Sequence, residues 1–201
     1  MKVRSLLLLL LFLLGALVIT TRFYPTVTRI EVSGNEHYSD EQLLALAHLS
    51  PGTPLLWVNT FSLRKLALDP WIARARLIRH WPDTISLMVW ERRPAASDGE
   101  TSWALDGTVL VGVSASERET LIRLRGWGPP RTEEALALAT LLEEYEPKVI
   151  SYTPEGFEIQ LSETLLFTPS VEALKNHWAA FRGQRGKRVA VYPWGVSIAN
   201  D

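Results

Sequence analysis

The sequence predicts an α+β protein in which an N-terminal transmembrane helix precedes two domains of mixed helices and strands. An uncharged apolar run extends from Leu6 to Thr20. A compact strand–helix–helix–strand–strand pattern lies between Val27 and Ala95, and short strands alternate with two helical segments after it. We expect the second domain to pack its helices against a mainly antiparallel sheet. The predicted divisions are a cytoplasmic N-terminus over 1–4, a transmembrane anchor over 5–24, a first domain over 26–95 and a second domain over 96–201.

Composition limits the class of protein before any motif is considered. A chain of 201 residues has room for one or two domains. The net charge of -1 argues against a nucleic-acid-binding protein, which usually concentrates basic charge. The chain has no cysteine, so disulfides, thiolate metal sites and cysteine nucleophiles are excluded.

The apolar run is long enough to be read as a membrane anchor. Extended from Ser5 to Thr21, it spans roughly 25 Å as a helix. That length is at the lower end for a transmembrane helix, which needs about 17 to 25 residues. Phe23 and Tyr24 follow it and would lie in the interface, where aromatic residues are enriched. The anchor is therefore predicted over residues 5–24.

The charges at the start of the chain predict the orientation of this anchor. Lys2 and Arg4 favour a cytoplasmic N-terminus, which leaves residues 25–201 outside the inner membrane. The alternative is a cleaved secretory signal, which also has a basic start and an apolar stretch. No good small-x-small cleavage site lies between Ala16 and Pro25, so the sequence favours an uncleaved anchor.

The first domain opens with a strand and a capped helix. Residues 27–32 alternate between two faces, as a half-buried strand does. Ser39 followed by Gln42 is a capping box, which predicts that an amphipathic helix starts at Ser39. A second short helix is expected over Phe61 to Leu68 and stops at Pro70.

Two paired strands complete this domain. Residues 73–77 alternate small or apolar residues with Arg74 and Arg76, which predicts a strand with a solvated basic face. Residues 84–90 are expected to pair with it across the Pro82-Asp83 turn. The predicted core of the domain consists of Ile30, Leu43, Leu66, Leu77 and Leu87.

The second domain alternates strand and helix signals. Asp106-Gly107, within residues 103–110, is the strongest local hairpin signal. Thr132 is expected to cap a helix that runs to Tyr145, and Ser170 a last helix with Leu174, Trp178 and Phe181 on one face. Further strands are expected over 121–124, 149–152, 157–161, 165–167, 188–192 and 196–198.

The sequence contains no recognisable reaction centre. His37, His48, His80 and His177 are scattered and do not have metal-ligand spacing. The nucleophile-elbow pattern GxSxG, the SxxK pair and the phosphate-binding GxxxxGK loop are all absent. We therefore expect a protein that is not an enzyme, with no catalytic residue, metal, cofactor or small-molecule substrate.

Three short motifs carry a family resemblance. A strand–helix–helix–strand–strand module directly after a single anchor resembles the POTRA (polypeptide-transport-associated) domain. Residues 70–72 (PWI), 79–84 (RHWPDT) and 91–95 (ERRPA) resemble the signature of the FtsQ/DivIB family of bacterial cell-division proteins. Ile72 replaces the usual valine, and His80 occupies a position that is commonly basic. The order of the later elements fits the second domain of that family, which is called the β domain.

The resemblance implies a scaffold of the bacterial division machinery at the septum. Such a protein would bind FtsB-like and FtsL-like division proteins outside the inner membrane and help to control septal wall synthesis. An alternative is a POTRA-type component of outer-membrane protein insertion or secretion, which predicts a run of long alternating strands. The segments after Asp98 are instead short and interrupted by two helices. A membrane-anchored cell-wall hydrolase or ligase would need a reaction site, which the sequence does not offer.

The last strand is the predicted partner site. The chain ends three residues after Ile198, so we expect Val196 to Ile198 to lie at a sheet edge that an extended partner segment can join. Tyr192 and Trp194 would act as aromatic anchors, with Arg188 pairing acidic residues at the rim. The resemblance implies the same site, because the family is thought to bind FtsB through these strands. The alternative is that Tyr192 and Trp194 close the core. The predicted partner-binding residues are Arg188, Tyr192, Trp194, Val196, Ser197 and Ile198.

Overall fold

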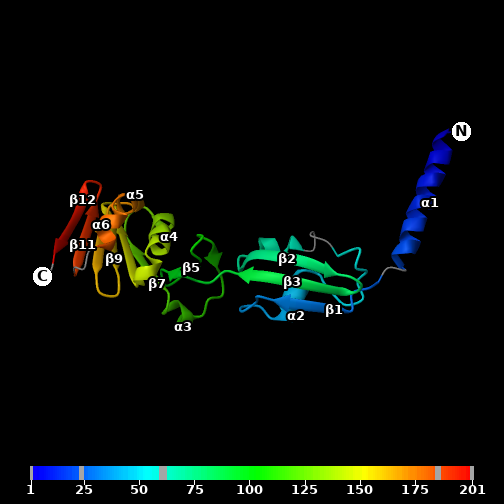
Figure 1. Cartoon of the computed structure of the whole chain (residues 1–201), viewed down its shortest axis with the longest axis horizontal. Coiled ribbons are helices and arrows are strands. Elements are labelled where there is room, and N and C mark those ends of the chain that lie inside the picture. Colours follow the sequence, from blue (N-terminus) through cyan, green and yellow to red (C-terminus); the bar gives the residue numbers. More distant parts are fainter. Residues whose placement is uncertain (1, 23–24, 59–62, 184–186, 200–201) are drawn as a thin grey trace. The chain divides into compact units, whose positions relative to one another are not determined.

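The chain forms two compact α+β units, 1–92 (unit 1) and 93–201 (unit 2) (Figure 1). The computed structural model describes residues 2–22, 25–58, 63–183 and 187–199. Within α1 (Lys2–Arg22) it describes the side chains of residues 7–16, 18 and 19.

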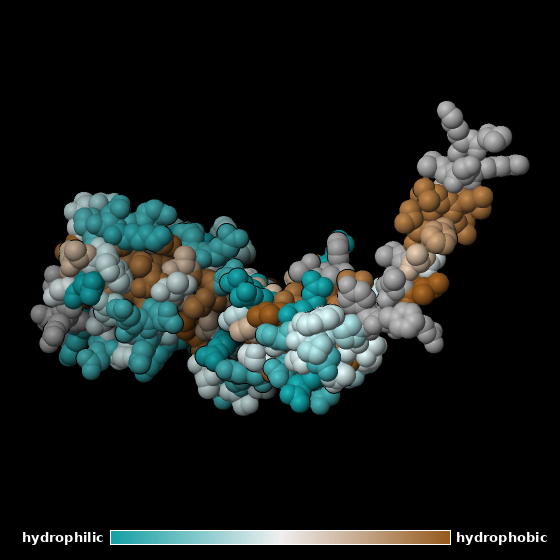
Figure 2. Space-filling model, turned by 45° about the vertical axis from the view of Figure 1, so that its right-hand side comes forward, coloured by the Kyte–Doolittle hydropathy of each residue, from teal (hydrophilic) through white to brown (hydrophobic). Residues whose placement is uncertain are grey.

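The N-terminal helix α1 exposes large apolar side chains on its described part, which is brown in Figure 2. Across the residues that the structure describes, no helix combines the length and the apolar character needed to cross a membrane. The transmembrane anchor predicted over residues 5–24 is therefore not confirmed. Part of that range, including Phe23 and Tyr24, lies outside the described residues.

Unit 1 is built on a three-stranded sheet in the order β1-β3-β2. Strand β1 (Arg29–Ser33) runs parallel to β3 (Thr84–Glu91), and β2 (Ile72–His80) pairs with β3 in an antiparallel hairpin, as predicted. A bulge between Ile72 and Arg74 shifts the alternation at the start of β2. Ala73, which was predicted to point inward, is consequently exposed.

The first helix of unit 1 is confirmed and the second is not. Helix α2 (Asp40–Leu46) starts with the predicted capping box: the Ser39 hydroxyl accepts a hydrogen bond from the Gln42 N–H, and the Gln42 side chain accepts one from the Ser39 N–H. Of the helix predicted over 61–68, the described part contains a 3₁₀ residue at Leu63 and the 3₁₀ turn η2 (Leu66–Leu68), and Phe61 lies outside the described residues. Pro70 holds the preceding residue in an extended conformation, which ends the turn.

The five residues predicted as the core of unit 1 separate into two groups. Leu43, Leu66 and Leu87 are completely buried, as predicted. Ile30 and Leu77 pack against the same cluster but remain partly exposed. Both belong to the outer strands β1 and β2, each of which pairs on one side only in the described sheet.

Unit 2 contains a nine-stranded sheet in the order β12-β11-β10-β9-β8-β7-β4-β5-β6. Five neighbouring pairs are antiparallel and three are parallel, so the described sheet is mixed rather than mainly antiparallel. Two of the parallel pairs arise because helices connect β7 to β8 and β10 to β11, and such crossovers return the chain in the same direction. In the third pair, the chain passes from β4 to β7 through β5, β6 and α3. The strands are β4 (Ala96–Ser97), β5 (Ser102–Trp103), β6 (Val109–Leu110), β7 (Ile122–Gly126), β8 (Val149–Thr153), β9 (Gly156–Gln160), β10 (Leu165–Thr168), β11 (Arg188–Tyr192) and β12 (Gly195–Ala199).

Helices α4, α5 and α6 lie where helices were predicted, although not every end agrees, and the short helix α3 was not predicted. Ser170 caps α5, since its hydroxyl accepts a hydrogen bond from the Ala173 N–H. Thr132 is the first residue of α4 rather than its cap. The predicted last helix is divided at His177 into α5 and α6. The helices are α3 (Ala115–Arg118), α4 (Thr132–Leu141), the 3₁₀ turn η3 (Glu143–Tyr145), α5 (Val171–Asn176) and α6 (Trp178–Arg182).

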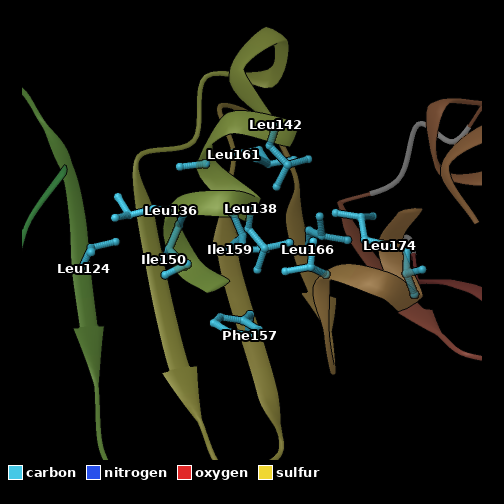
Figure 3. Close-up of a cluster of buried hydrophobic side chains, with 14 of the residues drawn as sticks. Leu124, Leu136, Leu138, Leu142, Ile150, Phe157, Ile159, Leu161, Leu166 and Leu174 are labelled. Atoms are coloured by element: carbon cyan, nitrogen blue, oxygen red, sulfur yellow. The ribbon is translucent and has the colours of Figure 1, made fainter. Parts of the chain in front are cut away.

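Helices α4, α5 and α6 share one buried cluster with the sheet of unit 2 (Figure 3). Leu138 and Leu174 pack there with Phe157, Ile159 and Leu166 of the central strands. Because side chains alternate along a strand, the residues between these buried ones lie on the opposite face of the sheet. The helices therefore cover one face, and the candidate site below uses the other face and the β12 edge.

Candidate functional site

The hairpin of β11 and β12 forms one end of the unit 2 sheet. Strand β12 pairs with β11 alone in the described sheet, with Tyr192 opposite Gly195. The two residues between them, Pro193 and Trp194, make the turn. The six predicted partner-binding residues all belong to this hairpin.

The register indicates which backbone groups of β12 face the open edge. The carbonyl of Lys187 accepts a hydrogen bond of 2.8 Å from the N–H of Leu165 on β10. Val189, two residues later, therefore turns its N–H and C=O toward β10 and not toward β12. Its partner in the hairpin, Ile198, must direct the same groups away from β11. Val196, two residues before it, does likewise, so both residues present a donor and an acceptor at the edge.

The turn carries a stacked pair of aromatic rings. The rings of Tyr192 and Trp194 lie 5.1 Å apart and nearly parallel, at 5°. Tyr192 also contacts Phe167 of β10, with ring centroids 5.7 Å apart. The His177 Nε2–H donates to the carbonyl of Pro193 at 3.0 Å, which ties the turn to the helical layer. Trp194 is 80% exposed, so it does not close the core as the alternative required.

The other predicted residues of the hairpin have graded exposure. Val196 is half-buried against the core of unit 2. Ser197, Ile198 and Arg188 are exposed, and Ile198 keeps 42% of its surface accessible. The edge therefore offers an apolar side chain beside backbone groups that no described strand pairs.

A shallow hollow of about 240 Å³ lies beside this edge on the face opposite the helices. Arg188 and Ser197 were predicted at the site, but its apolar floor of Leu165 and Phe167 was not. The signal was present, since Leu165 and Phe167 flank the buried Leu166 and so share the opposite face. The hollow is lined by Glu158, Leu165, Phe167, Arg188, Val189, Ala190, Ser197 and Ala199.

The motif residues of unit 1 form a separate structural cluster. The carboxylate of Glu91, at the end of β3, accepts hydrogen bonds from three consecutive backbone N–H groups in the loop before α2. These belong to Glu36 (2.7 Å), His37 (2.5 Å) and Tyr38 (3.1 Å). The His37 ring stacks on Trp71 at 3.6 Å. Glu91 thereby holds this loop against the sheet.

Asp69 and Arg92 complete the cluster. The Tyr38 hydroxyl and the backbone N–H of Trp71 both donate to the Asp69 carboxylate, at 3.0 and 2.9 Å. Burial, reinforced by this hydrogen bond, raises the pKa of Tyr38 to about 12. The Arg92 guanidinium donates to the carbonyls of Pro70 and Ile72, which fixes the start of β2. The family-like motifs at 70–72 and 91–92 therefore have a structural role.

We expect Glu91→Ala to destabilise unit 1 by roughly 1.5 to 3 kcal/mol, the value typical of hydrogen bonds to a charged group. Two of its three hydrogen bonds are exposed, so water replaces part of the loss. The matched control is Glu31→Ala on β1, because the Glu31 carboxylate is exposed and only accepts a long 3.5 Å bond from Ser86. Hydrogen exchange of the Leu87 amide measures both, and equal exchange rates in the two variants would contradict the role of Glu91.

Three of the histidines make contacts in different parts of the chain. No group of three or more histidine or acidic residues able to hold a metal ion occurs among them. His37 is stacked on Trp71, and His48 accepts a hydrogen bond of 2.6 Å from Lys65. His177 serves the β11–β12 turn in the other unit. These three histidines therefore act in separate local contacts.

Comparison with known proteins gives one family. A family model described as "POTRA domain, FtsQ-type" matches residues 26–92. Cell division protein FtsQ of Allochromatium vinosum is 35% identical over 117 residues, which is 55% of this chain and 45% of that protein. Cell division protein DivIB of Geobacillus kaustophilus is 28% identical over 176 residues, covering 73% and 67%. FtsQ of Syntrophotalea carbinolica is 36% identical over 74 residues, covering 36% and 26%. The matches thus span between 26% and 67% of these relatives' own length.

Proposed function

Because the chain belongs to the FtsQ/DivIB family of cell division proteins, which is a non-enzymatic family, we propose that it is a scaffold of the division machinery. It holds FtsB-like and FtsL-like proteins outside the inner membrane and helps to control septal wall synthesis. Residues 26–95 act as its POTRA domain and residues 96–201 as its β domain. The relatives above are named as cell division proteins, which favours this role over outer-membrane insertion or secretion.

The open edge of β12 carries the proposal for partner binding. An extended segment of the FtsB-like partner adds beside β12 as a further strand and pairs with the outward N–H and C=O groups of Val196 and Ile198. The stacked rings of Tyr192 and Trp194 supply apolar contact area at the turn. Arg188 and Ser197 line the neighbouring hollow, where Arg188 can pair with an acidic partner residue.

We further propose that α1 lies in the lipid of the division site. Its described leucines are more than half exposed, from Leu9 at 56% to Leu8 at 71%, and such a surface is unfavourable in water. Lys2 and Arg4 favour the cytoplasmic side, which leaves both units outside. Protease added to intact spheroplasts should then degrade unit 2, and its protection would refute this orientation.

Trp194→Ala should weaken binding of the FtsB-like protein by about 2 kcal/mol or more, as an aromatic hot spot does. Ile198→Pro should also weaken it, because proline removes an outward N–H and is tolerated at an edge. The matched control is Trp127→Ala, which truncates a tryptophan of the same unit that is 67% exposed after β7. Calorimetric titration of the full-length protein in detergent measures the three affinities.

The controls decide what a loss of binding means. Near-ultraviolet circular dichroism should be the same in each variant as in the parent protein, which separates a lost contact from a lost fold. Parental affinity in both correctly folded edge variants would remove the β12 edge as the site. A loss that also occurs in Trp127→Ala would show a non-specific contribution of exposed tryptophan.

A further inference from the structure

One end of unit 1 gathers two loops around the point where the chain arrives from α1. Residues 25–28 lie between the 52–57 loop and the β2–β3 turn. The Leu55 N–H donates to the Pro25 carbonyl at 3.0 Å, and the Thr28 N–H donates to the Asp83 carbonyl at 2.9 Å. The start of β1 and the β2–β3 turn are accordingly at the same end of the sheet (Figure 1).

This end exposes large apolar and aromatic side chains from both loops. Leu56 and Trp57 are 45% and 63% exposed, and Trp81, at the β2–β3 turn, is 69% exposed. The flanking Leu55 and Val58 are buried in the core, so the exposed pair is held in place by its neighbours. The exposure is thus a fixed feature of the folded unit.

The charge at the same end is cationic. Arg79 and His80 are exposed next to Trp81, and Arg29 is exposed at the start of β1. The acidic group of the turn, Asp83, is occupied by hydrogen bonds from the hydroxyls of Thr28 and Thr84. Tryptophan together with basic side chains is typical of protein surfaces at the bilayer interface, where aromatic rings lie at the headgroup level. Basic residues there are attracted to phosphate groups.

The covalent chain limits how far this end can be from α1. Helix α1 ends at Arg22, three residues before Pro25. Three residues span at most about 11 Å. If α1 lies in lipid, this end of unit 1 is therefore close to the headgroups wherever the rest of the chain points.

We propose that Leu56, Trp57 and Trp81 insert into the headgroup region of the phospholipid bilayer that holds α1, with Arg79 and His80 facing lipid phosphates. The inference rests on the membrane location of α1 in the proposed function. Unit 1 would then contact the bilayer directly through this surface, besides being linked to α1 by the chain.

The absence of cysteine allows the surface to be labelled at single positions. Leu56→Cys and His80→Cys place an environment-sensitive fluorophore beside the two tryptophans without removing them. Leu68→Cys is the control, because Leu68 is 78% exposed near the start of β2, at the other end of the strand. Leu13→Cys reports on α1 itself. Each full-length variant is reconstituted into mixed phosphatidylcholine and phosphatidylglycerol vesicles that carry a nitroxide at the lipid headgroup or, for the label at position 13, on the acyl chain.

Loss of fluorescence at positions 56 and 80, with the label at 68 unaffected, is the expected result. A Trp57→Ser, Trp81→Ser double substitution should restore the signal at 56 and 80 but leave quenching at 13 unchanged. Quenching at 13 without quenching at 56 and 80 would overturn the inference while keeping α1 in lipid. No quenching at any position would instead refute the membrane location in the proposed function.

Two other outcomes also exclude the lipid assignment. Equal quenching at 56, 80 and 68 would show general adsorption of unit 1 and not a defined surface. An emission shift at 56 and 80 that occurs in native membranes, but not in vesicles that hold no other protein, would assign the surface to a membrane-protein partner.

Discussion

Phe157→Ala should destabilise unit 2 by about 3 to 5 kcal/mol, the range for removing a large buried aromatic side chain. Phe157 is completely buried on β9, within the cluster that joins the helices to the sheet (Figure 3). The Arg131 guanidinium lies 4.1 Å from the centre of its ring. Truncation therefore leaves a cavity and also removes a cation–π contact.

The contacts of Arg131 should make Phe157→Ala more destabilising than the loss of side-chain volume alone. Its guanidinium donates to the Glu134 carboxylate and to the carbonyls of Thr153 and Pro169, which lie at the ends of β8 and β10. The hydrogen bond from Arg131 lowers the pKa of Glu134. Loss of the ring under Arg131 thus loosens the residue that links α4 to two strands.

The matched control for this prediction is Phe167→Ala on the adjacent strand. Phe167 is partly exposed on the opposite face of the sheet, so its removal costs less transfer free energy and creates no enclosed cavity. Hydrogen exchange of the Ile150 and Ile159 amides reports the opening free energy of unit 2 in both variants. Equal destabilisation by the two substitutions would show that the faces of the sheet are wrongly assigned.

Features set by neighbouring residues were predictable from the sequence. The capping box at Ser39, the Pro82-Asp83 turn and the Asp106-Gly107 hairpin each depend on a few consecutive side chains, and all three are present. The strand pattern of residues 188–198 likewise predicted the hairpin of β11 and β12.

Features set by distant partners were not predictable in the same way. Strand β10 lies parallel to β11 because helices form a crossover connection between them, and no local sequence pattern predicts that direction. The hollow beside β12 takes its walls from four strands, so its apolar floor appears only when those strands are paired. Glu91 bonds to a loop more than 50 positions earlier in the chain, so its motif indicated the residue but not its role.

Leu43→Ala should cost unit 1 about 2 to 5 kcal/mol, whereas Leu77→Ala should cost only about 1 kcal/mol. The sequence assigned both residues equally to the core. Leu43 on α2 is completely buried between the helix and the sheet, so its removal leaves a cavity that the surroundings can only partly fill. Leu77 lies on the outer strand β2 and keeps part of its surface in water, so water can occupy the space.

Hydrogen exchange of the Leu87 amide, in the middle strand of the sheet, measures both variants in the full-length protein. The two units need not unfold together, so a local probe is preferable to a single melting temperature. A cost for Leu77→Ala as large as that for Leu43→Ala would mean that the β2 edge is covered in solution. A partner or lipid against β2 would then have to be sought, because an outer strand gains such burial only from a second surface.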